Sequence, residues 1–125
     1  MDCDYGDRTN CWMINEIPTH IKNLRNLKTL SLTLNAIRTI PNELGNLINL
    51  TLIDLTDNTA LKNINSLTNL TNLQYLYLYG CSLTKLPDNI GDLKNLKVLG
   101  LVGNNLDKSE QTRIKKALPN CDIKF

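Results

Sequence analysis

The sequence predicts an α/β fold, a right-handed solenoid with a parallel β-sheet on its concave face and short helical or irregular segments on its convex face. Two observations predict it. Leu occurs 24 times and Asn 18 times among the 125 residues. Segments of the form L-x-x-[LI]-x-L begin at residues 27, 50, 73 and 96, each 23 residues after the one before. A fixed period of this length indicates a stack of repeated structural units.

The first half of each unit alternates in the manner of a half-buried strand. Leu30 and Leu32 alternate with Thr29, Ser31 and Thr33, which is the two-residue period of a strand with one buried face. The same pattern predicts strands near residues 29–33, 52–56, 75–79 and 98–102. Stacked units would pair these strands in parallel about 4.8 Å apart. Because one unit cannot bury its apolar face alone, its neighbours must stabilise it.

A second half follows in each unit and returns the chain along the opposite side. It begins with Ile17-Pro18, Ile40-Pro41, Ile64-Asn65 and Leu86-Pro87. The third unit is rearranged, because Thr59-Ala60-Leu61 lengthens the turn by one residue and the next segment is one residue shorter. The leucines expected to close the coils on this side are Leu24, Leu44, Leu47, Leu67, Leu70 and Leu93.

With Ile counted as Leu, residues 27–37, 73–83 and 96–106 match L-x-x-L-x-L-x-x-N/C-x-L, and 50–58 match up to the Asn. The chain therefore resembles the leucine-rich repeat family, in its short 23-residue class, over roughly residues 14–106. Buried side chains in the N/C position of the pattern are expected to bind loop carbonyls that would otherwise be unpaired. The family's name for this is an asparagine ladder. The residues in this position are Asn35, Asn58, Cys81 and Asn104.

Residues 107–125 are expected to cap the C-terminal end, and their last part is similar to the cap of many bacterial members. Asp107 with Glu110 predicts a capping box that opens a helix over about 108–118. The helix would place three apolar residues on its inner face, and an edge strand would follow. The inner residues of the helix and the strand would be Ile114, Ala117, Leu118, Cys121, Ile123 and Phe125.

Residues 1–13 are expected to form an N-terminal cap or partial repeat. Trp12 and Met13 would cover the first coil. The resemblance to extracellular members, whose N-terminal caps often carry a disulfide, leaves a Cys3–Cys11 disulfide as one possibility beside two free thiols. If Met1 is the natural start the protein is expected in the cytoplasm, and if a signal peptide was removed it is expected at the surface or secreted.

Residues that would support catalysis are missing from the pattern. His20 falls at a solvent-facing position with no Ser or Cys paired to it by a motif. There is no phosphate-binding glycine motif, and the carboxylates are scattered. The formal charge of +2 argues against nucleic-acid binding, and no apolar run approaches the roughly 18–20 residues that span a bilayer. We therefore expect no enzyme, cofactor or metal, and no membrane insertion.

The outward positions of the predicted sheet carry the candidate binding site. Three of the four tyrosines occupy all outward positions of one strand, and Gly100 would leave a notch beside Tyr77. Tyr gives a rigid contact surface with a polar tip and is enriched at binding hot spots, although it also favours strands in general. The candidate binding residues are Tyr75, Tyr77, Tyr79, Val98, Val102, Leu52, Asp54 and Thr56.

The leading functional prediction is a monomeric, non-enzymatic module that binds another protein through this concave face. One alternative is a carbohydrate-binding or adhesive surface protein, because tyrosines beside short polar side chains also suit sugars. Another alternative is the recognition domain of a larger receptor or effector.

Overall fold

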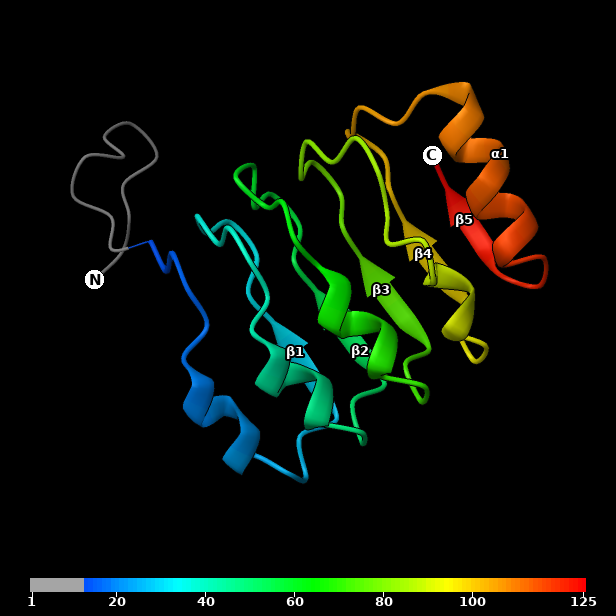
Figure 1. Cartoon of the computed structure of the whole chain (residues 1–125). Coiled ribbons are helices and arrows are strands. Elements are labelled where there is room, and N and C mark those ends of the chain that lie inside the picture. The colour runs from blue at the N-terminus through cyan, green and yellow to red at the C-terminus, as the bar shows by residue number, and fades with distance from the viewer. Residues whose placement is uncertain (1–12) are drawn as a thin grey trace.

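A computed structural model describes residues 13–125 of the chain (Figure 1). Residues 1–12 of the expected N-terminal cap, which include Trp12 and the Cys3–Cys11 pair, lie outside the described residues. Met13, the last residue of the expected cap, is described, and its side chain is exposed. In chain order the elements are the 3-10 helix η2 (Thr19–Asn23), β1 (Thr29–Ser31), η3 (Asn42–Asn46), β2 (Leu52–Asp54), η4 (Asn65–Asn69), β3 (Tyr75–Tyr77), η5 (Ile90–Asp92), β4 (Val98–Gly100), the α-helix α1 (Lys108–Ala117) and β5 (Asp122–Lys124).

The five strands form one parallel sheet in sequence order. Leu30, Ile53, Leu76, Leu99 and Ile123 lie side by side across it. Figure 1 shows the strands in one layer and the short 3-10 helices stacked in a second layer, with α1 at the C-terminal end. The predicted fold class, an α/β solenoid with a parallel sheet and short helical segments opposite, is confirmed.

Each strand is shorter than the sequence predicts, and the chain reaches a left-handed residue three positions after the strand ends. The strands have three residues rather than five. Positive φ angles follow at an equivalent position of each coil, 58° at Leu34, 61° at Asp57, 61° at Gly80 and 82° at Gly103, and the third coil has a second at Ser82 (57°). The equivalent residues are 23 positions apart, so each coil leaves the sheet in the same way. Leu34 is an unusual residue for this conformation, which favours Gly, Asn and Asp.

A buried side chain joins each of the central coils to the one before it. The Asn58 amide donates from Nδ2 to the carbonyls of Leu32 (2.9 Å) and Leu55 (2.8 Å), and its Oδ1 accepts from the backbone N–H of Ile37 (3.0 Å). In the next coil the Cys81 thiol donates to the Leu55 carbonyl at 3.2 Å. Burial raises the pKa of Cys81, so the thiol keeps the proton that it donates.

The same position in the outer coils is less enclosed than expected. Asn104 donates to the carbonyls of Leu78 (2.7 Å) and Leu101 (2.8 Å), and Asn35 donates to that of Leu32 (3.1 Å). Asn58 and Cys81 are buried, whereas Asn35 and Asn104 are half-buried. The difference follows from their places near the two ends of the stack.

A second row of amides, which was not predicted from the sequence, joins the coils on their outer rim. Asn49 donates from Nδ2 to the carbonyl of Arg25 at 2.9 Å, and Asn95 to that of Thr71 at 2.7 Å. Asn72 makes the same bond to Ile48 at 2.8 Å. Each bond reaches 24 residues back along the chain. The abundance of Asn therefore serves two rows of contacts between coils.

The core lies between the sheet and the 3-10 helices. Leu76 and Leu99 are fully buried at its centre. The leucines expected to close the coils are also buried, with one exception: Leu24 is 52% exposed. It belongs to the first coil, and no described residue forms a coil in front of it.

Helix α1 is joined to the last coil through hydrogen bonds of Glu110 and Arg113, which form an ion pair within the helix. Asp107 caps the helix by accepting from the Glu110 N–H at 2.8 Å. The Glu110 carboxylate reaches the previous coil instead of closing a capping box, and accepts from the Leu86 N–H at 2.8 Å. Arg113 pairs with Glu110 and donates to the Leu86 carbonyl at 2.9 Å. The hydrogen bond from Arg113 is the main reason why the pKa of Glu110 is lowered.

Removal of a central core leucine should destabilise the whole stack. We expect Leu76→Ala or Leu99→Ala to lower the free energy of unfolding by about 2–5 kcal/mol, because each leaves a cavity among fixed neighbours. Ser31 is exposed on β1, so Ser31→Ala should change it by less than about 0.5 kcal/mol. Urea denaturation followed by circular dichroism measures both. Equal values for the two kinds of variant would contradict the register of the sheet.

The ion pair of the cap should give the protein a measurable acid sensitivity. Because the folded pKa of Glu110 is lowered, its contribution is present above the unfolded pKa near 4.5 and is lost as pH falls through the folded value. Glu110→Gln should lower the free energy of unfolding at pH 7 by about 1–2 kcal/mol. It should also flatten the decline in stability between pH 5 and 3.

The exposed Lys85–Asp88 pair provides a control for this experiment. Asp88→Asn also removes one carboxylate near the cap, but from a solvent-exposed pair, so it should change stability little. Urea denaturation at a series of pH values compares the two variants. If Glu110→Gln follows the pH dependence of the unaltered protein, the ion pair does not hold the cap.

Candidate binding surface

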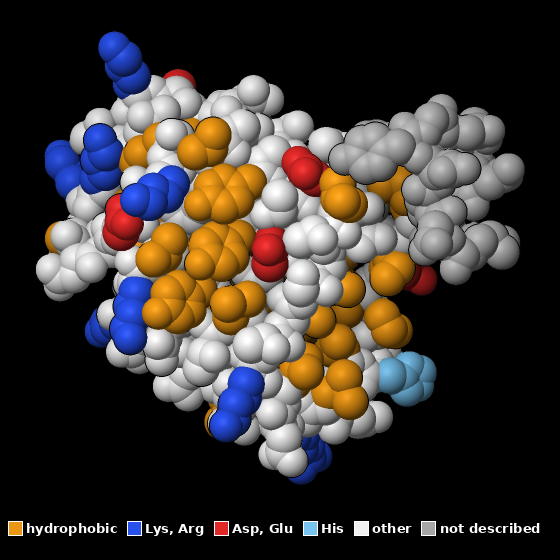
Figure 2. Space-filling model, turned by 180° about the vertical axis from the view of Figure 1, so that it is seen from behind, with side chains coloured by type: hydrophobic (Ala, Val, Ile, Leu, Met, Phe, Trp, Pro, Cys, Tyr) orange, Lys and Arg blue, Asp and Glu red, His pale blue; other side chains and the backbone are white. Residues whose placement is uncertain are grey.

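Three tyrosines form a column on the concave face. Tyr75 and Tyr77 lie in β3, and Tyr79 follows two residues later; all three are half-buried. Tyr77 stands between Asp54 of β2 and Gly100 of β4 in the register of the sheet. We call these three side chains the tyrosine strip. Figure 2 shows the molecule from this side, with hydrophobic side chains gathered in a patch and charged side chains beside it.

The rings of Tyr77 and Tyr79 stack on each other, and the Tyr79 ring fills the notch that was expected at Gly100. The ring centroids of Tyr77 and Tyr79 are 5.9 Å apart, and their planes differ by 15°. A Cβ atom placed on Gly100 would lie 2.7 Å from Cε2 and from the hydroxyl of Tyr79. The notch predicted beside Tyr77 is therefore occupied by the ring of Tyr79. Sequence register alone could not show this, because Tyr79 crosses from its own strand towards the next.

Two carboxylates lie along the flank of the strip that faces β2. Asp54 is half-buried, and its Oδ1 accepts from the Thr56 N–H at 3.0 Å. The Asp57 N–H donates to the Tyr79 carbonyl at 2.8 Å. The carboxylate of Asp57 occupies the space that a side chain on Gly80 would need. Asp57 was not among the sequence candidates, because it falls at the left-handed turn rather than at an outward strand position.

The flank of the strip that faces β4 carries apolar side chains, and charged side chains lie beyond them on β5. Val98 is half-buried and Val102 is 50% exposed. Beyond β4, the outward residues Asp122 and Lys124 of β5 form an ion pair at 2.9 Å. The hydrogen bond that Lys124 donates to the Asp122 carboxylate raises the pKa of Lys124. The inner residues of this strand were predicted, but its outer ones were not among the candidates for the concave face, although the same alternation places them there.

The other sequence candidates lie around the strip. Leu52 stands beside Tyr75 in the register of the sheet and is half-buried, as is Thr56. The structure thus brings the candidates from β2, β3 and β4 onto one face. On β1 the outward residues Thr29 and Ser31 are small and exposed. The concave face is therefore bulky over β3 and low over β1.

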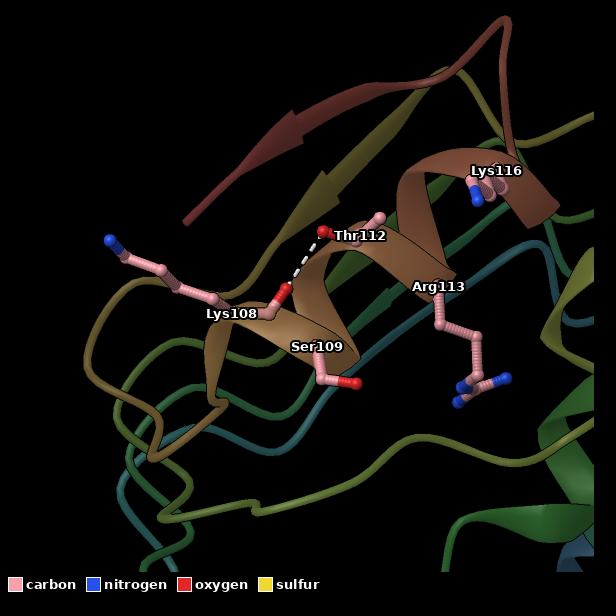
Figure 3. A pocket seen from close by; sticks show the side chains of 5 residues that line it. All are labelled: Lys108, Ser109, Thr112, Arg113 and Lys116. Atoms are coloured by element: carbon pink, nitrogen blue, oxygen red, sulfur yellow. Dashed lines mark hydrogen bonds between the residues drawn. The ribbon is translucent and has the colours of Figure 1, made fainter.

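Two hollows lie elsewhere on the surface. One follows the outer side of α1 and is lined by Lys108, Ser109, Thr112, Arg113 and Lys116 (Figure 3). The Thr112 hydroxyl donates to the Lys108 carbonyl at 2.8 Å, and Arg113 is held by Glu110. The other hollow follows the outer row of amides and is lined by Asn49, Thr51, Asn72, Gln74, Asn95 and Lys97. In the second hollow most of the lining side chains already bind backbone carbonyls, whereas in the first only Thr112 and Arg113 do.

The described residues gather no set of catalytic groups. His20 is exposed, and no cluster of three or more metal-binding side chains lies within residues 13–125. Burial, with Asp122 adding a smaller effect, raises the pKa of Cys121 to about 11, and burial also raises that of Cys81, which disfavours the thiolate at both. Among the same residues, no helix combines the length and apolar character that crossing a bilayer requires.

The close approach of Tyr79 to Gly100 can be tested directly. Gly100→Ala should push the Tyr79 ring off β4 and break its stack on Tyr77, because the new methyl group would overlap the ring. Stability should change by less than about 1 kcal/mol, since the ring can move into solvent. Aromatic NMR shifts of the tyrosines report the stack. Unchanged shifts in Gly100→Ala would contradict this placement of Tyr79, and Val102→Ala serves as a control that leaves the stack in place.

Comparison with known proteins agrees with the repeat and the fold. A model of leucine-rich repeats in two copies matches residues 71–115, and a model of the single leucine-rich repeat matches residues 26–47. Among curated proteins, none matches the chain. A leucine-rich repeat protein of Leptospira interrogans has a similar structure, with a TM-score of 0.86 and 36% identity over 90% of this chain and 29% of its own length.

Two other solved structures share the fold. An internalin of Listeria monocytogenes has a TM-score of 0.72 and 25% identity, over 89% of this chain and 31% of its own. The leucine-rich repeat ectodomain of an Arabidopsis thaliana membrane receptor kinase has a TM-score of 0.50 and 23% identity, over 81% of this chain and 16% of its own. The chain thus spans less than a third of each of these structures. From the repeat, the sheet and these matches, the chain belongs to the leucine-rich repeat proteins.

Proposed function

We propose that the chain is a non-enzymatic module that binds another protein through its concave face, centred on the tyrosine strip. The observation that carries the proposal is the placement of Tyr75, Tyr77 and Tyr79 together on the central strand of the sheet and the residues that directly follow it. The leucine-rich repeat fold is typically a non-enzymatic scaffold, and the family generally mediates protein–protein interaction.

The physical properties of the strip suit a binding hot spot. Tyr77 and Tyr79 restrain each other by stacking, and the strand beneath them is fixed by neighbours on both sides. Side chains that are already ordered lose little entropy on binding, so more of the contact energy remains as affinity. The surrounding residues of the proposed surface are Leu52, Asp54, Thr56, Val98 and Val102.

A carbohydrate ligand is the second candidate, and the stacked rings of Tyr77 and Tyr79 beside Asp54 favour it. The apolar neighbours favour a protein instead, because Leu52, Val98 and Val102 add surface that a sugar cannot pair with. The chain spans under a third of its structural neighbours, which is compatible with a third role as the recognition domain of a larger receptor or effector. We propose a monomer as the binding form.

The strip should dominate binding while contributing little to folding. Tyr77→Ala should weaken binding of a protein partner by about 2 kcal/mol or more, because it removes the central aromatic contact. The free energy of unfolding should fall by less than about 1 kcal/mol, since the ring is only half-buried. Partners are captured on immobilised protein, identified by mass spectrometry and titrated by calorimetry, and urea denaturation gives the stability.

The matched control lies on the convex side, where Asn46 of η3 and Lys94 after η5 are exposed. Asn46→Ala with Lys94→Ala should leave the affinity unchanged. A glycan array probed with the same proteins tests the second candidate, and sugar binding lost with Tyr77→Ala would favour it. If the convex variant loses its partner and a triple tyrosine variant keeps it, the concave face is not the binding surface.

A further inference from the structure

We propose that the tyrosine strip receives a basic side chain, arginine or lysine, from the partner protein. This inference rests on the proposed function and adds the chemistry of the partner to it. The observation behind it is that Asp54 and Asp57 line the same flank of the strip, next to Tyr77 and Tyr79 respectively. A cation placed there would meet aromatic rings on one side and carboxylates on the other.

Asp54 keeps acceptor capacity for a partner. Its Oδ1 accepts from the backbone N–H of Thr56, which fixes the side chain on the concave face. A carboxylate has two oxygens and about four acceptor sites, so this single bond leaves most of them unused. The carboxylate is half-buried beside Tyr77. An acceptor that is fixed and partly shielded from water binds a cation more strongly than a freely solvated one.

Asp57 adds a second carboxylate at the end of the strip. Its backbone N–H donates to the Tyr79 carbonyl, and its side chain lies over Gly80, where the absence of a side chain makes room. The left-handed backbone of Asp57 directs the residue out of the sheet at this point. The two carboxylates are three residues apart in sequence, and both lie on the β2 side of the strip.

Asp54 and Asp57 give the β2 flank of the strip a local negative charge, which a bound cation would neutralise. The ion pairs among residues 13–125 are Lys85–Asp88, Glu110–Arg113 and Asp122–Lys124, and none includes Asp54 or Asp57. Lys124, on the opposite flank, is paired with Asp122. The chain as a whole carries a formal charge of +2, so the two unpaired carboxylates form a negative region on a chain whose net charge is positive. An acidic partner segment would be repelled here.

The rings and the carboxylates suit the same ligand group. The faces of tyrosine rings attract cations, and arginine also stacks flat on them. A guanidinium can stack on a ring while its N–H groups bind a carboxylate in two places. Uncharged apolar side chains would use the rings but leave both carboxylates partly desolvated and unpaired, which is unfavourable. The combination therefore selects a basic residue over a neutral one.

The experiment uses a phage-displayed library of random 12-residue peptides, selected on the full chain at low and at physiological salt. The test variant is Asp54→Asn with Asp57→Asn. Asn retains the oxygen that accepts from Thr56, and it tolerates the left-handed backbone at 57. Glu43→Gln with Asp92→Asn, on the 3-10 helices of the convex side, is the control that removes the same charge. The selected peptides are then synthesised and titrated against each variant.

We expect the selected peptides to be enriched in Arg or Lys and to bind the Asp54/Asp57 variant about tenfold or more weakly. Their affinity should fall with added salt, and less so in that variant. Peptides that need the tyrosines but carry no cation and bind both proteins equally would overturn this inference and leave the proposed function standing. Peptides that bind a triple tyrosine variant as well as the unaltered chain would overturn both.

Discussion

Each coil leaves backbone groups unpaired where the chain turns away from the sheet, and a side chain of the following coil must bind them. Asn58 does this for Leu32 and Ile37, and Cys81 does it for Leu55. An unpaired carbonyl in the core is costly. This requirement fixes where one coil lies against the next, and the 23-residue spacing of the sequence follows from it.

The concave surface depends on that alignment. Because successive coils are held in one register, residues 23 positions apart stand beside each other across the sheet, as Asp54, Tyr77 and Gly100 do. A surface that combines side chains from several strands can then be rigid although each strand has only three residues. The outer row of amides at Asn49, Asn72 and Asn95 reinforces the alignment at the rim.

The fold class could be predicted from the sequence because the repeat encodes it several times over. The outward positions of β2, β3 and β4 follow from the same alternation. What lay outside the repeat was harder to predict. The outward Asp122 and Lys124 belong to the final strand, and Glu110 binds Leu86 across the interface of helix and coil. Such contacts depend on where two different elements meet, which no periodic pattern contains.

Local conformation explains the remaining differences. The ring of Tyr79 lies over Gly100 because one residue has a long side chain and its neighbour has none, and neither residue alone indicates that direction. Three positions after each strand the chain adopts a left-handed residue, at 34, 57, 80 and 103, where the residue types are Leu, Asp, Gly and Gly. Because the residue types at this position differ so much, the backbone angles reveal the turn but the sequence does not predict it.

That repeated left-handed turn has a consequence for how such a protein can change over evolutionary time. Every coil leaves the sheet at an equivalent residue, and the chain returns to β2, β3 and β4 through a 3-10 helix and to β5 through α1. A duplicated 23-residue segment would therefore insert one more strand, widening the concave surface by about 4.8 Å. The cap at α1 would keep its own contacts with the last coil. The span of the surface can thus grow in whole strands, independently of the side chains that give any one strand its chemistry.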